Sequence, residues 1–209
     1  QSWSTDDQVK EPVTVGDADA MTPARYGAAG SYDDPDDQDD GSKTRSEMRT
    51  HYDGSWDLDT SRASGTAPWA KGTSWSFDGT SAHPSFGYTA SETYQVYDAT
   101  IWHDTGLARL KTAATRSYNS NAAFGGTWDA ALTAVDGSQS RSYMTTDYNG
   151  SYDAAGKING GRAPTSAGWS WSDDGMKHFT ASELRQDYDP VMWGTFGKTL
   201  LKESVVQSW

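Results

Sequence analysis

The chain has very few aliphatic side chains from which to build a hydrophobic core. It contains 7 Leu, 2 Ile and 8 Val in 209 residues. With its 5 Phe, these residues reach only about half the level below which composition indicates disorder. The 10 Trp and 11 Tyr oppose that conclusion, because aromatic rings bury large areas and are scarce in disordered chains. We therefore predict a folded protein whose core is built mainly from Trp and Tyr.

The acidic residues are nearly all Asp. The net charge is −12, and 24 of the 29 acidic residues are Asp. Asp favours turns and helix caps whereas Glu favours helix interiors, so we do not expect a helical bundle. The charge also argues against a general nucleic-acid binder, because neutralising phosphates requires a basic face.

The cysteine count and the hydropathy restrict the chemistry further. With no Cys, the chain has no disulfide, zinc–thiolate site or catalytic thiol. No apolar run reaches membrane-spanning length, and no segment has the pattern of a signal peptide. The dominance of Ser, Thr, Gly, Asp and aromatic residues favours an extracellular protein or a component of a cell or particle surface.

Tight-turn dipeptides recur along the chain and predict its fold class. Asp-Gly or Asn-Gly begins at residues 40, 53, 78, 136, 149, 159 and 174. These pairs suit the positive φ angles of hairpin turns, so the chain should form a run of antiparallel strands. The fold we expect is an all-β sandwich or jelly roll with long polar loops. Residues Thr93–Leu110 have the clearest strand-pair pattern, with neither face wholly apolar.

A short unit of an aromatic residue, a glycine turn and a second aromatic residue recurs. It occupies Tyr52–Asp57, Phe124–Asp129 and Tyr148–Asp153, with a fragment at Gly30–Asp33. The unit is either repeated hairpin chemistry, in which two rings pin a turn, or a ligand-binding repeat. Its irregular spacing argues against a solenoid.

One or two short helices are expected near the C-terminus, in two candidate segments. Thr180–Glu183 fits a capping box at the start of one, and the apolar spacing in Phe196–Trp209 fits a terminal helix, although Val205-Val206 could equally close a sheet. We divide the chain into an extended acidic arm, residues 1–42, with one possible strand at Pro12–Val15, and a single β domain, residues 43–209.

An acidic run near the start of the chain has the spacing of a calcium loop. Oxygen-bearing residues alternate around Gly41, as in the twelve-residue loop that wraps Ca²⁺. No other cofactor is expected, and the alternative is a solvated acidic loop. The candidate calcium ligands are Asp36, Gln38, Asp40, Ser42 and Glu47.

Directly after this run comes the main basic cluster. If the segment is a strand, Arg45, Glu47, Arg49 and His51 project from one face, with Lys43 at its start. Two guanidinium groups separated by a carboxylate suit a carboxylate or sulfate ligand. The alternative is an ordinary ladder of surface ion pairs.

The basic cluster resembles a motif of a known enzyme family. Arg45-Ser-Glu-Met-Arg49 resembles the R-[ST]-E-L-R strand of the alginate-lyase superfamily, β-jelly-roll enzymes that cleave uronic-acid chains by β-elimination. Ile101-Trp102-His103 is similar in part to the second motif of that family, which has Gln where this chain has Ile101. The resemblance covers only these two motifs.

The resemblance implies roles for particular residues. Arg45 and Arg49 would neutralise the uronate carboxylate and Glu47 would orient them, while His103 would be the base and a tyrosine such as Tyr97 or Tyr148 the acid. The residues expected to line the substrate groove are Lys43, His51, Gln95 and Trp102.

Two hypotheses about function follow. In the first, the protein engages an acidic, uronic-acid polysaccharide, with or without β-elimination. In the second, it is a non-enzymatic structural or adhesive subunit of a surface filament, virion or multiprotein assembly, ordered partly by neighbouring protein subunits. The tryptophans Trp69, Trp75, Trp169 and Trp171 fit a sugar-stacking platform, but we expect most of them in the core, since rings must replace the missing aliphatic residues.

Overall fold

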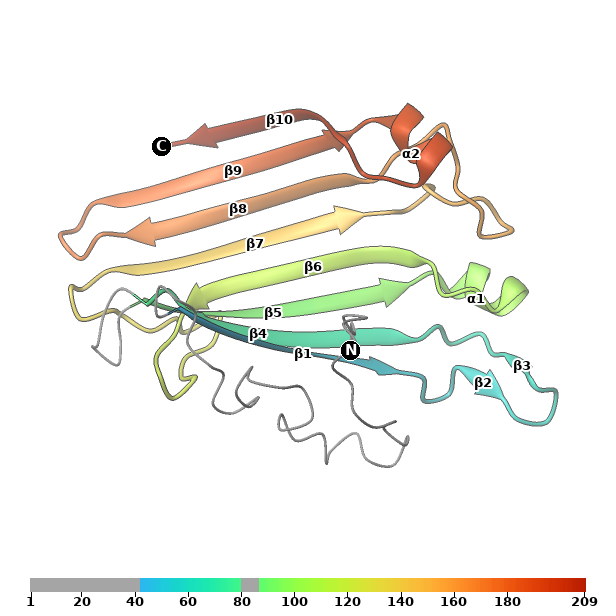
Figure 1. Cartoon of the computed structure of the whole chain (residues 1–209), viewed down its shortest axis with the longest axis horizontal. Helices are drawn as coiled ribbons and strands as arrows, with labels where there is room; N and C mark the ends of the chain where they lie inside the picture. The colour runs from blue at the N-terminus through green and yellow to red at the C-terminus, as the bar shows by residue number, and fades with distance from the viewer. Residues whose placement is uncertain (1–41, 80–86) are drawn as a thin grey trace.

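The computed structural model describes residues 42–79 and 87–209. Eight strands form one antiparallel sheet in the order β1-β4-β5-β6-β7-β8-β9-β10, so that successive long strands are neighbours (Figure 1). The strands are β1 (Lys43–His51), β4 (Trp69–Phe77), β5 (Tyr88–Tyr97), β6 (Leu110–Asn119), β7 (Gln139–Asp147), β8 (Thr165–Asp173), β9 (Phe179–Tyr188) and β10 (Leu201–Ser208). The all-β antiparallel class predicted from the turn dipeptides is confirmed.

The shorter elements gather at one end of this sheet (Figure 1). The strands β2 (Trp56–Asp57) and β3 (Arg62–Ala63) form a small second sheet within the connection from β1 to β4. Helix α1 (Ala99–Thr105) connects β5 to β6, and helix α2 (Pro190–Phe196) connects β9 to β10. One helix, α2, lies near the C-terminus, where one or two were expected, and α1 lies in the middle of the chain. The predicted strand at Pro12–Val15, like nearly all of the arm, lies outside the described residues.

The prediction that Thr93–Leu110 is a strand pair is wrong in its second half. Strand β5 ends at Tyr97, and the next residues form α1. The Asp98 carboxylate caps this helix by accepting hydrogen bonds from the backbone N–H groups of Thr100 (2.9 Å) and Ile101 (3.0 Å). Gly106 ends it in the left-handed region at φ 70°. An Asp cap and a Gly stop are local signals that a search for strand alternation does not detect.

The helices predicted at the C-terminus are also corrected. Thr180–Glu183 lies inside strand β9, because its residues continue the antiparallel ladder with β8 from Asp173 to Thr165. The segment after Phe196 forms strand β10, which is the sheet alternative that Val205-Val206 suggested. The helix that does form, α2, begins after Asp189, whose carboxylate caps it as Asp98 caps α1.

The second half of the fold repeats the first. The series β1, β4, β5, α1, β6 corresponds to β7, β8, β9, α2, β10 in order, in pairing and in sequence. Equivalent residues are 96 positions apart before the β4–β5 and β8–β9 connections and 91 apart after them, because the first connection is longer. Identical pairs include Arg45/Arg141, Ser46/Ser142, Met48/Met144, Tyr52/Tyr148, Pro68/Pro164, Gly72/Gly168, Trp75/Trp171, Glu92/Glu183, Tyr97/Tyr188, Asp98/Asp189, Trp102/Trp193 and Gly106/Gly197. We call the two halves unit 1 and unit 2.

This duplication explains the short aromatic unit and its irregular spacing. Tyr52–Asp57 and Tyr148–Asp153 are equivalent turns that follow β1 and β7. Phe124–Asp129 belongs to the β6–β7 connection instead, and Gly30–Asp33 precedes its last four residues by the same 96 positions. The chain therefore contains two different aromatic–glycine motifs, and each recurs after 96 residues. Because the two alternate along the chain, their spacing looks irregular, and the expectation of an irregular repeat is corrected.

Each unit is held at its helical end by one buried tryptophan. The Trp102 indole donates a hydrogen bond to the Ser55 carbonyl (2.9 Å), and the Trp193 indole donates to the Ser151 carbonyl (3.1 Å). The two indoles are 3% and 5% exposed. A second ring packs edge-on against each: Trp56 against Trp102, with centroids 4.9 Å apart, and Tyr152 against Trp193, at 5.7 Å. This tryptophan joins the turn after the first strand of a unit to the helix before its last strand.

We predict that Trp102→Phe or Trp193→Phe lowers the free energy of unfolding by about 1 to 2 kcal/mol, because each removes a buried hydrogen bond and part of a packed ring. The measurement is urea unfolding followed by circular dichroism. The matched control is Trp209→Phe, since that side chain is 68% exposed. Equal losses in all three variants would contradict the assignment of Trp102 and Trp193 as the core of each unit.

Candidate functional site

The two faces of the large sheet carry different chemistry. Because side chains alternate along a strand, the antiparallel register assigns every strand residue to one face or the other. One face, which we call the aromatic face, carries nearly all the rings and charges. Its members from β1 to β8 include Arg45, Glu47, Arg49, Lys71, Trp75, Glu92, Tyr94, Arg116, Tyr118, Arg141, Tyr143, Trp169 and Trp171.

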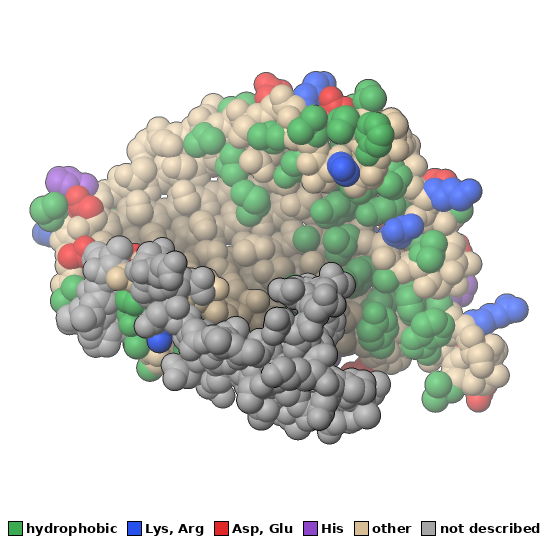
Figure 2. Space-filling view, in the orientation of Figure 1, with side chains coloured by type: hydrophobic (Ala, Val, Ile, Leu, Met, Phe, Trp, Pro, Cys, Tyr) green, Lys and Arg blue, Asp and Glu red, His purple; other side chains and the backbone are tan. Residues whose placement is uncertain are grey.

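The other face, the hydroxyl face, consists largely of Ser, Thr and small residues. Its central row is a serine on every one of the eight strands, and neighbouring hydroxyls in it bond at 2.8 Å at both Ser91–Ser117 and Ser182–Ser208. Figure 2 shows a hollowed face whose centre is mostly tan, as expected for this surface. The row is Ser46, Ser74, Ser91, Ser117, Ser142, Ser170, Ser182 and Ser208.

Arginines on the aromatic face lie against aromatic rings. The Arg116 guanidinium is 4.9 Å from the centroid of Trp128, a residue of the β6–β7 connection. Arg141 lies 5.6 Å from Trp128 and 5.4 Å from Trp171. Such cation–π contacts let long side chains cover one another, since among the described residues no second large sheet covers this face. The rings of this face therefore pack within a shared layer of aromatic and cationic groups.

A pocket of about 200 Å³ lies on the aromatic face of unit 1. The Arg45 guanidinium lies 3.4 Å from the Phe124 ring centroid and 5.9 Å from that of Trp75. Trp75 is fixed by its indole N–H, which donates to the Asn121 carbonyl (3.2 Å), and by edge-on contact with Phe124 at 4.8 Å. We call this the Arg45 pocket; its lining is Arg45, Thr73, Ser74, Trp75, Ala90, Ser91, Tyr118 and Phe124.

The equivalent position in unit 2 is filled. Thr73 of unit 1 corresponds to Trp169 of unit 2, and the Trp169 ring packs edge-on against Trp128 with centroids 5.4 Å apart. Arg141 and Trp171 keep the places of Arg45 and Trp75. The small Thr73 side chain thus leaves space in unit 1 that a tryptophan occupies in unit 2, so the units share a frame but differ at this site.

A larger hollow, of about 340 Å³, lies next to the Arg45 pocket, toward the end of the sheet opposite the helices. Its walls include Phe77, Tyr88, Asn119 and Ser140. We place the candidate site at the Arg45 pocket, because that pocket combines a guanidinium group with aromatic walls.

Tyr118 forms one wall of the Arg45 pocket and is 8% exposed. Burial raises the pKa of its phenol above the usual value near 10, and the nearby Glu92 carboxylate raises it further. The hydroxyl therefore keeps its proton at neutral pH, where it can donate a hydrogen bond and has no tendency to act as a base.

The residues expected to form a lyase site do not come together. Arg45, Glu47 and Arg49 share the aromatic face of β1, and Glu47 pairs with Arg49. Tyr97 lies on the hydroxyl face of β5, where its hydroxyl donates to Gln95 (3.2 Å). Tyr97 is seven residues along β5 from Ala90 of the pocket, or about 23 Å at the rise of a strand.

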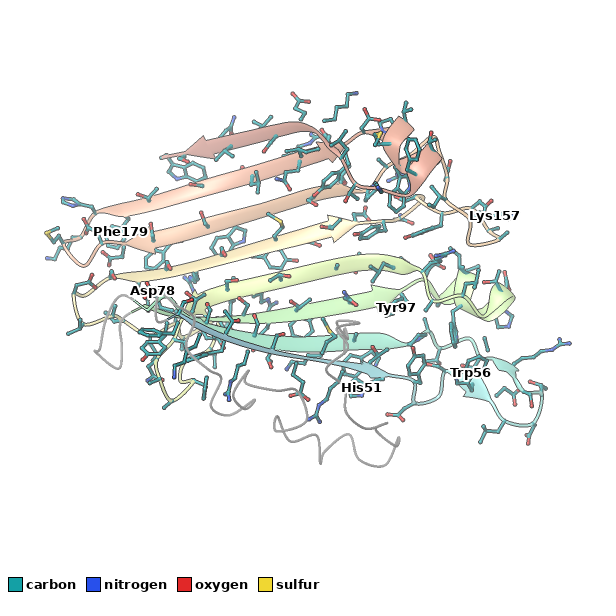
Figure 3. The ribbon with its side chains drawn as sticks, in the orientation of Figure 1. His51, Trp56, Asp78, Tyr97, Lys157 and Phe179 are labelled. Carbon is teal, nitrogen blue, oxygen red and sulfur yellow. The ribbon has the colours of Figure 1, made fainter. Side chains whose placement is uncertain are left out.

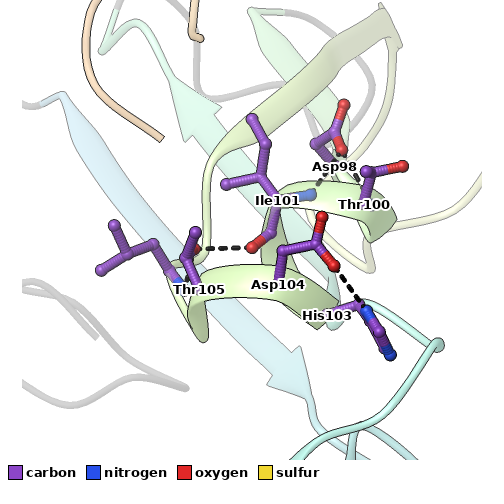
Figure 4. Close-up of polar contacts among 7 residues, drawn as sticks. Asp98, Thr100, Ile101, His103, Asp104 and Thr105 are labelled. Carbon is purple, nitrogen blue, oxygen red and sulfur yellow. Dashed lines mark hydrogen bonds and ion pairs between the residues drawn. The ribbon is translucent and has the colours of Figure 1, made fainter. Parts of the chain in front are cut away.

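The expected base and its neighbours lie at the helical end of the sheet. His103 is exposed on α1, where its ring bonds the Asp104 carboxylate at 2.7 Å (Figure 4). Trp102 is the buried core of unit 1, and Tyr148 contacts its counterpart Trp193 with centroids 6.2 Å apart. Figure 3 shows Tyr97 and Trp56 toward this end and Asp78 and Phe179 at the opposite end.

The other predicted substrate-binding residues on β1 have structural contacts. The His51 ring stacks on Trp69 with centroids 4.0 Å apart and an angle of 13° between planes. Lys43 lies opposite Phe77 in the register with β4. Of the four weighed tryptophans, only Trp75 is buried, whereas Trp169 and Trp171 are partly buried and Trp69 is nearly half exposed. The expectation that most of them lie in the core therefore holds for Trp75 alone.

The predicted calcium loop falls mostly beyond the described residues. Asp36, Gln38 and Asp40 lie outside them, Ser42 lies at their boundary, and Glu47 belongs to strand β1 rather than to a loop. Within residues 42–79 and 87–209, no group of three or more His, Asp or Glu side chains is arranged to hold a metal ion.

Comparison with known proteins identifies no relative: the chain matches no family model, no curated protein and no solved structure. Among the described residues, no helix is long and apolar enough to span a membrane. The site must therefore be interpreted from its own chemistry.

Sequence reasoning identified Arg45 but missed its aromatic partners. Phe124 and Tyr118 come from the β6–β7 connection and from β6, and no local pattern joins them to Arg45. The 96-residue repeat is a sequence signal that points to this pocket. It aligns Arg45 with Arg141, and it shows that Thr73 stands where the second unit has Trp169.

We predict that the protein loses stability as pH rises above about 10. Desolvation raises the pKa of Tyr118, and it also raises the pKa values of Tyr97, Tyr148 and Tyr152. A phenol whose folded-state pKa exceeds its unfolded value contributes its full stability below the unfolded pKa and loses it as pH rises through the folded pKa. Urea unfolding at pH 8 to 11 measures this decline. Tyr118→Phe should make the decline shallower, and an unchanged slope would contradict the assignment.

Proposed function

We propose that this protein is an extracellular or surface carbohydrate-binding protein that engages an acidic, uronic-acid polysaccharide and holds one uronate residue in the Arg45 pocket. The observation that carries the proposal is the combination, in a single pocket, of the Arg45 guanidinium with the rings of Trp75, Phe124 and Tyr118. A guanidinium group binds a carboxylate with two parallel hydrogen bonds, and aromatic walls pack against the apolar face of a sugar ring.

The size of the pocket limits what it can hold. Its volume of about 200 Å³ is below the ~300 Å³ of the smallest typical small-molecule sites, so it suits a single sugar ring of a longer chain. The net charge of −12 opposes the approach of a polyanion. Affinity must therefore come from local contacts at Arg45 and the ring walls, without long-range attraction.

The proposed activity is binding without cleavage. β-Elimination needs a base close to the C5 proton of the bound uronate. His103 lies on α1 beyond the sheet end, Tyr97 lies on the opposite face, and Tyr118 keeps its proton at neutral pH. The proposed binding requires no cofactor.

We predict that alginate or polygalacturonate oligomers quench the tryptophan fluorescence of the protein in a saturable way, whereas neutral oligosaccharides of the same length do not. Arg45→Ala should weaken binding about tenfold or more, because a hydrogen-bonded charge pair contributes about 1.5 kcal/mol or more. Arg62→Ala is the matched control, since it removes an exposed arginine of β3 at the helical end of the protein.

Thr73→Trp provides a second test of the pocket. The substitution places in unit 1 the residue that unit 2 already carries at the equivalent position, so the fold should accept it while the pocket is filled. We expect an unchanged melting temperature and loss of uronate binding. Full binding by this variant would contradict the location, and no binding of any oligouronate by the wild-type protein would contradict the function. Incubation should give no ultraviolet absorbance of an unsaturated sugar product; its appearance would overturn the claim that the protein does not cleave.

A second candidate function is a structural or adhesive subunit of a surface assembly. It is favoured by one observation, the exposed strand β10, all of whose residues are exposed at an edge of the described sheet.

A further inference from the structure

Strand β10 has the place of β6 in the repeated fold but lacks the neighbour that β6 has. Strand β6 lies between β5 and β7, whereas β10 pairs with β9 alone in the described part of the chain. Equivalent residues differ accordingly in exposure: Tyr118 of β6 is 8% exposed and its counterpart Trp209 is 68% exposed. Val206, the counterpart of the partly buried Thr115, is 59% exposed.

The repeat itself indicates what pairs with such an edge. In the middle of the sheet, β6 of unit 1 pairs with β7, the first strand of unit 2. Strand β1 is the equivalent of β7, with identical residues at Arg45/Arg141, Ser46/Ser142 and Met48/Met144. The β6–β7 junction is therefore an internal example of a last strand joined to a first strand.

The backbone of β10 is oriented for the same pairing. Trp209 and Ala181 exchange two backbone hydrogen bonds, each 3.0 Å long. Every second residue before Trp209 in β10 therefore also directs its backbone N–H and C=O groups toward β9. The backbone groups of Ser204, Val206 and Ser208 then point to the outer edge. In β6 the backbone of Lys111 faces β7, where its carbonyl accepts a hydrogen bond from Tyr148, and the same alternation directs Ala113, Thr115 and Ser117 to that side.

The same argument identifies the matching groups on β1. Strand β7 faces β6 through Ser142, Met144 and Thr146, which pair with Ser117, Thr115 and Ala113. Their counterparts on β1 are Ser46, Met48 and Thr50, and in the described residues the only strand that pairs with β1 is β4, on its other side.

We propose that two copies of this protein join edge to edge, with β10 of one copy pairing antiparallel with β1 of the next. The register carried over from the β6–β7 junction pairs Ser208 with Ser46, Val206 with Met48, and Ser204 with Thr50. This inference deepens the second candidate function and does not depend on polysaccharide binding.

Two features of the sheet continue across this junction. The serine row of the hydroxyl face passes from Ser208 of one copy to Ser46 of the next without a break. On the aromatic face, Trp209 comes to lie beside Arg45 of the next copy, as Tyr118 lies beside Arg141 within the chain. Because the two edges differ, the contact is head-to-tail and builds rings or filaments rather than closed two-fold dimers.

Cysteine cross-linking tests both the partner and the register, since the natural chain contains no Cys. We expect a mixture of Ser208→Cys and Ser46→Cys proteins, oxidised gently, to give a disulfide-linked dimer of the two. Opposite residues of an antiparallel pair lie about 5.5 Å apart, within the span of a disulfide. The matched control replaces Ser46→Cys with Thr44→Cys, two residues along the same edge, and should give at least fivefold less product.

Each possible result of the cross-linking experiment has a different consequence for the proposal. A dimer formed by Ser208→Cys protein alone would show that β10 pairs with β10 and would overturn the proposal. Equal yields with Thr44→Cys would overturn the register, and the absence of any dimer up to millimolar protein would overturn the edge contact itself.

Sedimentation of cysteine-free protein completes the test. Val206→Pro removes a backbone N–H that points to the outer edge, so it should keep the wild-type melting curve while it abolishes concentration-dependent association. Wild-type protein that stays monomeric across the same concentrations contradicts the proposal. Uronate binding by a monomeric protein would leave the proposed function intact, and assembly without uronate binding would leave this inference intact, so the two failures are distinguishable.

Discussion

The fold depends on one buried hydrogen bond in each unit, from a tryptophan indole to the backbone carbonyl of a serine in a distant turn. In unit 1 this bond joins Trp102 of α1 to Ser55, and in unit 2 it joins Trp193 of α2 to Ser151. It ties the turn after the first strand to the connection before the last one, so that four strands close into a unit. An indole does this where a leucine cannot, because it fills a core and satisfies a polar group together.

The scarcity of aliphatic side chains also shapes the rest of the sheet. Arginines 45, 116 and 141 cover aromatic rings on one face, and hydroxyl groups bond one another in rows on the other. Where this layer is complete, as around Trp169, it is a packed surface. Where a small residue interrupts it, as at Thr73, it leaves a pocket walled by rings and a guanidinium group. Structure and proposed binding thus come from the same kind of contact.

The sequence predicts the fold class, because Asp-Gly and Asn-Gly turns and the scarcity of Glu are local properties. It also places Arg45, Glu47 and Arg49 correctly on one face of a strand. It failed at α1 because Asp98 and Gly106 are short signals inside an alternating pattern. The pocket could not be predicted locally, since Phe124 reaches Arg45 only after the β6–β7 connection folds against the aromatic face. The duplication was readable in principle, but two interleaved motifs concealed its 96-residue period.

The central claim is that two equivalent units are each closed by one buried indole. Hydrogen exchange of the ten tryptophan indole N–H groups, followed by NMR and assigned with single Trp→Phe variants, tests it most directly. The account predicts that Trp102 and Trp193 exchange slowest and at similar rates, while Trp209 exchanges within the time needed to record a spectrum. Exchange of Trp102 or Trp193 as fast as that of Trp209 would contradict it.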